Sequence, residues 1–218
     1  MMLLSYHPPL TPYLDILYQD EQILVLNKPS GLLSVPGKAA EHYDSLEYRV
    51  KRVWPLSRIV HRLDMATSGL IVMAMTADSQ RHLNRQFQLR QTSKHYIARV
   101  SGQVKSEQGS IELPLICDWP ERPKQKVCYQ YGKPSLTRYK ILTREPQATR
   151  LQLEPVTGRS HQLRVHMLWL GHPILGDKFY GTEISYNAAP RLQLHAAGLS
   201  LRHPLTEQYL TFNSPCPF

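Results

Sequence analysis

Hydrophobic positions along this chain follow two different periods, which predict two kinds of element. Short apolar runs and alternating apolar and polar residues, bounded by turn-forming residues, are typical of strands. They predict strands over residues 15–18, 23–27, 70–75, 94–100, 110–116, 136–142, 150–153, 191–201 and 209–212. Side chains of a strand point alternately to opposite faces, so Tyr96, Ala98 and Val100 are expected on one face of the fourth strand.

Apolar residues three or four positions apart predict three helices. A polar residue is expected at the start of each helix, namely Asp44, Thr76 and Ser160. The second helix is expected to reach about Gln91 and to carry Arg81 and Arg85 on its outer face. The third is expected to stop at Gly171, because glycine readily adopts the left-handed conformation that ends helices.

Strands outnumber helices and do not alternate with them, which predicts the α+β class with a largely antiparallel sheet. The length of 218 residues suits one domain or two lobes that share a core. The longest clean apolar stretch, residues 70–75, is far shorter than the ~20 residues of a membrane helix, and the N-terminus lacks the pattern of a signal peptide. Cys117, Cys128 and Cys216 form no C-x-x-C pair, which predicts reduced, mostly buried thiols in a cytosolic protein.

The formal net charge of +9 is concentrated in two segments of the chain. Residues 49–99 carry a net +8 and residues 122–140 a net +6, whereas residues 1–48, 100–121 and 141–218 carry −4, −3 and +2. We call the two positive segments the first and second basic blocks. Aromatic residues lie within both blocks, which favours a nucleic-acid partner held through its phosphates. The alternative is a solvated surface that only maintains solubility.

One acidic side chain has an unusual position inside the first basic block. The segment HRLDMATSG, residues 61–69, contains Asp64, which is one of only two acids in that block. Surrounding positive charge favours the ionised form of a carboxylate, and shielding by Leu63 and Met65 would suit a nucleophile or a base. The alternative is a structural aspartate in a turn, which pairs with Arg62 or accepts from backbone N–H groups.

Five segments resemble, in order, the motifs of the RluA-type pseudouridine synthases, which isomerise uridine in RNA to its C-glycoside. HRLDMATSGL resembles the catalytic motif of that family, and NKPSGLLSVPG at 27–37 resembles its amino-terminal motif. KHYIARV at 94–100 resembles the strand that bears its tyrosine. PVTGRSHQLRVHMLWLGHPILGD at 155–177 resembles its carboxy-terminal motif, and LQLHA at 192–196 resembles its closing strand.

The resemblance implies a fold and a division of the chain. The fold is the pseudouridine synthase catalytic fold, a mixed and largely antiparallel sheet flanked by helices and loops. No S4 domain is expected, because the first motif begins near residue 22. Residues 1–21 are then an N-terminal extension, and residues 22–218 form a single catalytic domain of two lobes that share one sheet. No cofactor and no metal ion are implied, since bonds are exchanged within one nucleotide.

The resemblance also assigns roles to three residues. Asp64 matches the essential aspartate of the family, which either attacks the ribose C1′ or takes a sugar proton. Arg164 matches the arginine that pairs with this aspartate and fixes its orientation; a phosphate clamp or a surface ion pair is the alternative. Tyr96 matches the active-site tyrosine, whose ring can stack on the uracil and whose hydroxyl can assist removal of the C5 proton. Taken alone, a strand tyrosine is more often a core residue.

Several further side chains are expected to bind RNA or to help extrude the target base. They are Arg62, His61, Arg81, Arg85 and Lys28. Arg62 matches the family's candidate for filling the gap left by the flipped uridine, and a phosphate contact or an ion pair is the alternative. For Lys28, a structural role in its loop is equally open.

The segment ICDWPERPKQKVCY, residues 116–129, resembles the short dual-specificity branch of the family. That branch implies two substrates, uridine 32 in the tRNA anticodon loop and uridine 746 in a hairpin loop of 23S rRNA, and a cytoplasmic monomer. Two other functions stay open. One is a non-catalytic RNA-binding or ribosome-assembly protein on the same scaffold. The other is an N- or O-glycoside hydrolase, although such enzymes usually need a second carboxylate.

Overall fold

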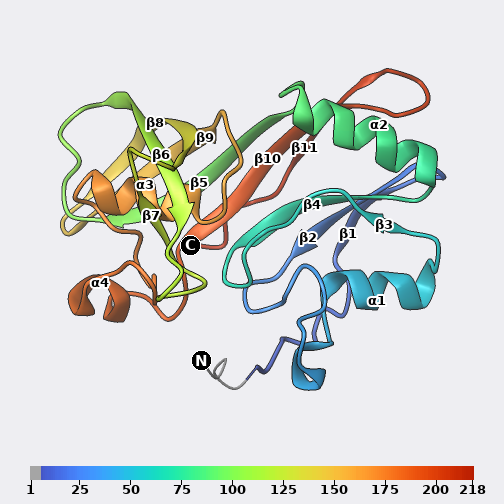
Figure 1. Cartoon of the computed structure of the whole chain (residues 1–218), viewed down its shortest axis with the longest axis horizontal. Helices are drawn as coiled ribbons and strands as arrows, with labels where there is room; N and C mark the ends of the chain where they lie inside the picture. The colour runs from blue at the N-terminus through green and yellow to red at the C-terminus, as the bar shows by residue number, and fades with distance from the viewer. Residues whose placement is uncertain (1–5) are drawn as a thin grey trace. The chain divides into compact units, whose positions relative to one another are not determined.

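The computed structural model describes residues 6–218, which divide into two compact units (Figure 1). The first unit contains residues 6–93 and 196–216, and the second contains residues 94–195 with the last two residues. The chain therefore leaves the first unit after Ser93 and returns to it inside β10 (Leu194–Arg202). Of the expected N-terminal extension, residues 1–5 lie outside the described part of the chain. Residues 6–21 belong to the first unit.

The first unit is built on a sheet whose central strands are buried on both faces. Its strand order is β1 (Ile16–Gln19), β2 (Ile23–Lys28), β4 (Ser68–Ala74), β10 and β11 (Tyr209–Asn213), and the two-residue β3 (Arg58–Ile59) pairs with β4. Residues 23–26 of β2 and 70–74 of β4 are all apolar and buried, and burying both faces of such strands removes large apolar areas from water. Gly69, the second residue of β4, has a φ of +113°, and a Cβ there would lie 2.3 Å from the Ala196 carbonyl oxygen.

Two helices accompany this sheet, α1 (Leu46–Val53) and α2 (Ala77–Gln88). Figure 1 shows α2 along one side of the sheet and α1 on the other. The capping role of Thr76 is confirmed, because its Oγ1 accepts from the Ser79 N–H at 3.1 Å. The cap expected at Asp44 is wrong: Ser45 caps α1, while the Asp44 carboxylate receives two hydrogen bonds from the buried guanidinium of Arg49.

The second unit contains an antiparallel sheet covered by one helix. Its strand order is β5 (Ser93–Ser101), β9 (Ala148–Pro155), β8 (Lys133–Glu145), β6 (Gln108–Cys117) and β7 (Gln125–Val127). The helix is α3 (Gln162–Trp169), which packs against the buried face of this sheet through contacts such as the one between Gln162 and Thr137. A short helix, α4 (Glu183–Asn187), completes the unit.

Three helix boundaries test the sequence expectations. α3 begins at Gln162 rather than Ser160, because His161 has a left-handed φ of +53°. The predicted stop at Gly171 is confirmed by its φ of +87°. α2 ends at Gln88, three residues before the expected end at Gln91, because Arg90 also has a left-handed φ, of +58°.

The predicted strands are all present, with ends shifted by up to three residues, and every pairing described within a unit is antiparallel. The α+β class is therefore confirmed. Four short elements were not predicted: β3, β7, α4 and the 3₁₀ turn Ala40–His42. The three cysteines form no disulfide and are half-buried, which is less than expected. Within residues 6–218, no helix is long and apolar enough to cross a membrane.

Candidate active site

Asp64 lies in the loop of the first unit that joins β3 to β4. Its side chain is half-buried, and its carbonyl oxygen accepts from the Thr67 N–H at 3.1 Å, which closes a turn. Leu63 before it is buried, as expected, but Met65 after it is 42% exposed. Of the two apolar neighbours in the loop, only Leu63 is therefore placed to shield the Asp64 carboxylate from water.

His61 fixes the start of this loop to the sheet. The Val72 N–H of β4 donates to His61 Nε2 at 3.0 Å. The imidazole therefore accepts a backbone hydrogen bond that a carbonyl of a neighbouring strand would otherwise accept. The same ring stacks on Phe87 of α2 with the centroids 4.7 Å apart. These contacts indicate that His61 positions the loop, and the RNA contact expected from the sequence stays a prediction.

We call residues 60–67, between β3 and β4, the Asp64 loop. Residues 27–37 contain a second loop, which holds the backbone of the Asp64 loop on both sides of Asp64. Ser34 Oγ donates to the Leu63 carbonyl at 2.7 Å and accepts from the Leu63 N–H at 3.1 Å. Ser30 Oγ donates to the Ala66 carbonyl at 2.7 Å, and the Gly31 N–H donates to the Met65 carbonyl at 2.8 Å. The backbone on both sides of Asp64 is thus hydrogen-bonded to a second loop, which restricts its conformations.

Lys28 joins the same two loops from inside the protein. Its side chain is fully buried, and its ammonium donates to the carbonyls of Pro29, Leu32 and Met65 at 2.9, 2.7 and 3.1 Å. A buried ammonium needs such acceptors to offset its lost hydration. The structural alternative for Lys28 therefore fits its surroundings, and an RNA contact does not.

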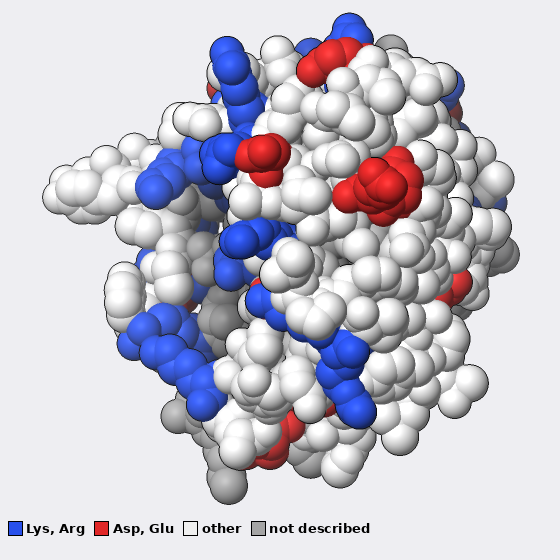
Figure 2. Space-filling model, turned by 90° about the vertical axis from the view of Figure 1, so that its right-hand side faces the viewer, with Lys and Arg blue, Asp and Glu red and all other residues white. Residues whose placement is uncertain are grey.

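Arg62 is exposed, and within residues 6–218 its guanidinium has no ion pair. Arg81 and Arg85 are exposed on α2, as expected; Arg81 pairs with Asp78, whereas Arg85 has no ion pair in the described part of the chain. In the face drawn in Figure 2, Lys and Arg side chains gather in one half, with few acids among them. Such clusters attract phosphate groups.

Two further site residues predicted from sequence lie in the second unit, where Tyr96 is a half-buried residue of β5. Tyr96 pairs with Leu153 of β9, so the register of this sheet fixes the position of its backbone. Lys94 precedes it on the same face, and burial lowers the pKa of Lys94 from its ordinary value. Its Nζ lies 3.9 Å from the place that a Cβ on Gly158 would occupy.

Arg164 is a buried residue of α3, and it forms a bidentate pair with Asp177. Its Nε and Nη2 donate to the two carboxylate oxygens at 2.8 and 2.7 Å, and both side chains are less than 5% exposed. Asp177 Oδ1 also accepts from the N–H groups of Phe179 and Tyr180. The rings of these two residues each lie 5.1 Å from the guanidinium carbon. The guanidinium is therefore fixed in place by charge and by packing.

Sequence reasoning assigned no role to Asp177. The signal was available, because Asp177 is the last residue of the segment that resembles the carboxy-terminal motif. The structure thus places Asp64, Arg62 and His61 together in the first unit, and Tyr96, Arg164 and Asp177 in the second.

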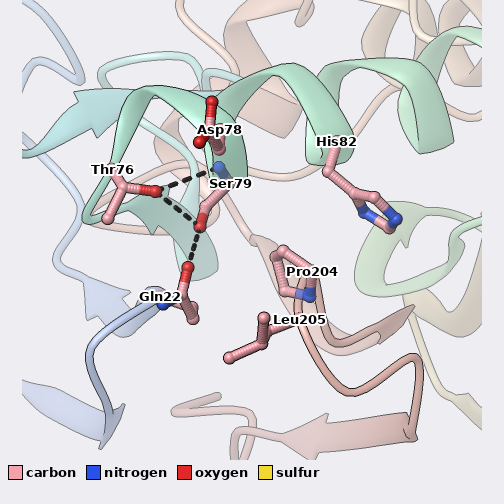
Figure 3. Close-up of a pocket in the computed structure, with 7 residues that line it drawn as sticks. All are labelled: Gln22, Thr76, Asp78, Ser79, His82, Pro204 and Leu205. Atoms are coloured by element: carbon pink, nitrogen blue, oxygen red, sulfur yellow. Dashed lines mark hydrogen bonds between the residues drawn. The ribbon is translucent and has the colours of Figure 1, made fainter.

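A pocket of about 390 Å³ lies elsewhere in the first unit, beside the start of α2. Figure 3 shows Gln22, Thr76 and Ser79 linked by hydrogen bonds along one wall, with Pro204 and Leu205 facing them. Thr76 and Ser79 follow the C-terminal end of β4, whereas Asp64 precedes its N-terminal end. At about 3.3 Å per residue, the strand separates the two places by roughly 20 Å. The pocket is therefore separate from the Asp64 loop.

The chain is similar to known proteins over its whole length. A family model described as RNA pseudouridylate synthase matches residues 22–169. The dual-specificity RNA pseudouridine synthase RluA of Pasteurella multocida is 53% identical over 219 residues, which cover all of both chains. The proteins of that name from Salmonella typhimurium and Escherichia coli (strain K12) are each 55% identical over 215 residues, or 98% of both chains.

Solved structures agree with this result. The structure of human RNA Pseudouridylate Synthase Domain Containing 1 superimposes with a TM-score of 0.81 at 27% identity, covering 97% of this chain and 87% of that one. Human RNA Pseudouridylate Synthase Domain Containing 4 gives a TM-score of 0.76 at 25% identity, covering 93% and 88%.

Proposed function

We propose, from the premise that this chain belongs to the RNA pseudouridylate synthase family, that Asp64 is its catalytic carboxylate. The chain is an isomerase that converts uridine in RNA to pseudouridine. In this reaction the bond from ribose C1′ to uracil N1 breaks and a bond from C1′ to C5 forms. The proton lost from C5 balances the proton gained at N1, so the atoms of one nucleotide suffice. Asp64 either attacks C1′ or takes a sugar proton to release the uracil.

The observation that carries this proposal is the restraint of the Asp64 loop. Hydrogen bonds hold the backbone of Leu63, Met65 and Ala66, while the Asp64 side chain itself stays half-exposed. A reacting carboxylate needs this combination of a fixed backbone and an accessible side chain.

We assign supporting roles to three other residues. Arg164 orients the Asp64 carboxylate, and Asp177 is a positioning residue that fixes Arg164. Tyr96 stacks on the uracil and assists removal of the C5 proton. The support of both residues within the second unit favours these roles, because Asp177 holds the Arg164 guanidinium and strand pairing holds the Tyr96 backbone.

The substrate we propose is a uridine in a structured RNA loop, extruded from its stack before reaction. Arg62, exposed next but one to Asp64, fills the space that the uridine leaves. The names of the most similar relatives include dual specificity, and we extend this to a tRNA anticodon loop and a 23S rRNA hairpin as the two substrates. The protein acts as a cytoplasmic monomer.

The decisive experiment maps pseudouridine in transcribed tRNA and 23S rRNA fragments after incubation with the protein. Asp64→Asn should abolish product while RNA affinity persists, because the amide keeps the size of the side chain but loses its charge. Asp78→Asn is a matched control, since Asp78 is the other acid of the first basic block and is 82% exposed at its side chain. Product formation by Asp64→Asn at the wild-type rate would contradict the proposal.

The same experiment tests the alternative of a non-catalytic RNA-binding protein. That alternative requires RNA binding without any pseudouridine in the wild-type reaction. A glycoside hydrolase would instead release free uracil from the RNA, which chromatography of the reaction detects.

A further inference from the structure

We propose that two loops of the second unit form a stacking platform for unpaired bases of RNA. The loops are residues 118–124 and 128–132, which precede and follow β7. We define the platform by its three aromatic side chains, Trp119, Tyr129 and Tyr131. The inference rests on the proposed function in one respect, that RNA is the ligand. None of the three side chains has a role in the proposed reaction at Asp64.

The first observation is the exposure of these side chains. Trp119, Tyr129 and Tyr131 are 63%, 76% and 70% exposed, which makes them the most exposed aromatic residues of the described chain. Exposed single apolar residues are ordinary on protein surfaces, but a group of large ones marks an interaction site. Here all three fall within 13 residues of sequence.

The strand register brings the two loops to the same end of the sheet. Leu115 of β6 faces Val127 of β7 on one side and Lys133 of β8 on the other. The 128–132 loop therefore crosses β6 at this level, where the Cys128 N–H donates to the Pro114 carbonyl at 2.9 Å. β6 ends two residues later, at Cys117, where the other loop begins. The two loops therefore meet β6 two residues apart, at Leu115 and Cys117. At about 3.3 Å per residue, these two positions are separated by roughly 7 Å along the strand, about the length of two stacked bases.

Both loops are held in shape by their own backbones. The Asp118 N–H donates to the Lys124 carbonyl at 2.9 Å, and the Gly132 N–H donates to the Cys128 carbonyl at 2.8 Å. Backbone N–H groups, chiefly that of Tyr131, also hydrogen-bond to the Cys128 sulfur and lower the pKa of this thiol. Pre-formed loops of this kind present their side chains at a small cost in conformational entropy.

The charges around the platform favour RNA over a protein partner. The guanidinium of Arg122 lies 3.8 Å from the Trp119 ring, and Lys133 is exposed without an ion pair among the described residues. The acids Asp118 and Glu121 are paired with lysines. No large aliphatic side chain in residues 118–133 is exposed. Aromatic rings with unpaired cations suit bases and phosphates, whereas protein interfaces are generally more apolar at their centre.

The test measures equilibrium binding to a 12-nucleotide oligouridylate and to a fully paired RNA duplex of the same length. Trp119→Ala, and Tyr129→Ala combined with Tyr131→Ala, should each weaken binding of the single strand by about 5-fold or more, because stacking contributes that much per base. The duplex offers no free base faces, so its affinity should stay within about twofold. Trp119→Phe and the matching Tyr→Phe pair keep the rings and should bind within about threefold of the wild type.

Salt dependence separates stacking from phosphate binding. The aromatic variants should lower the affinity at every salt concentration without changing the slope of log K against log salt, since they remove no charge. Lys133→Ala should instead reduce that slope. Tyr209→Ala is the matched control, because Tyr209 is an exposed tyrosine of β11, outside the platform. Thermal unfolding checks that each variant is folded.

Three results would overturn the platform. The first is that the wild type does not bind the single strand, and the second is that the aromatic variants lose equal affinity for the single strand and the duplex. The third is that these variants lose self-association of the protein while their RNA affinity stays unchanged. The last would show a protein-docking surface. These readouts use binding alone, so they stand apart from the Asp64→Asn experiment. If that variant kept full activity, the proposed catalytic role would fail and the platform would still be judged by its own data.

Discussion

At the scale of single residues, two helices of this chain end in the same way with different residues. After α3, the His172 N–H donates to the Met167 carbonyl and Gly171 has a φ of +87°. After α2, the Gln91 N–H donates to the Gln86 carbonyl, and Arg90 stands in the position of Gly171 with a φ of +58°. Glycine adopts this conformation freely, whereas a residue with a Cβ does so at a cost. Sequence alone therefore predicted the end of α3 at Gly171 and placed the end of α2 too late.

We predict that Arg90→Gly stabilises the protein by about 1 kcal/mol, because the left-handed conformation then carries no Cβ. Gly171→Ala should destabilise it by a similar amount, since a Cβ at Gly171 meets nothing within 4 Å and only the backbone conformation opposes it. Urea denaturation of the two variants and the wild type measures both changes. Equal stability of Arg90→Gly and the wild type would contradict the argument.

At the scale of elements, the sequence predicted the strands and helices that carry a clear pattern of apolar and polar residues within their own length. The buried strands β2 and β4 and the capped helix α2 were found because apolar periodicity and caps are local signals. β3 and β7 were missed because two or three residues carry no period and pair only where the fold brings a partner strand. The site follows the same division. Motif resemblance supplied Asp64, Tyr96 and Arg164 as the proposed site residues, whereas the buried role of Lys28 and the pairing of Asp177 depend on tertiary contacts.

The Arg164–Asp177 pair shows how an element becomes part of a site. It joins α3 to the segment after it, and both side chains are buried. We predict that Asp177→Asn destabilises the protein by on the order of 3 kcal/mol, because removal of one charge from a buried ion pair is costly. Pseudouridine formation should fall as well, since Asp177 positions Arg164.

Glu145→Gln serves as the matched control for this prediction. Glu145 pairs with Arg99 on the same unit, but the two side chains are about 30% exposed, and such pairs contribute less than about 1 kcal/mol. Chemical denaturation compares the two variants. A similar small loss for both would show that the Arg164–Asp177 pair does not stabilise α3.

At the scale of the whole molecule, the charge is divided between the two units. Most of the first basic block belongs to the first unit, around the Asp64 loop, and the second block belongs to the second unit, where it includes residues 122–124 and 128–132 of the platform loops. The net charge of +9 thus combines positive charge that each unit carries and that can hold RNA phosphates. Residue counts alone do not reveal this division, because it depends on where the chain leaves the first unit and returns to it.

Whole-molecule stability should depend on pH through one buried histidine, His166 of α3. Its Nε2 lies 2.9 Å from Ser135 Oγ, which itself donates to the Leu113 carbonyl, so Nε2 carries the proton of the neutral ring. The buried Nδ1 has no hydrogen-bond partner within the described residues. Burial lowers the pKa of His166 from 6.5 to about 4, because protonation would place a charge in an apolar site.

The unfolded chain therefore binds a proton at His166 at higher pH than the folded chain does. Stability from the neutral ring is complete above about pH 6.5 and is lost as the pH falls towards 4, by up to about 3 kcal/mol. Unfolding measured between pH 4 and pH 7 should show this decline in the wild type. His166→Gln removes the titrating group and should flatten the profile over that interval, while His7→Gln removes an exposed histidine and controls for loss of an imidazole. If His166→Gln loses stability with falling pH as steeply as the wild type does, another group governs the acid response.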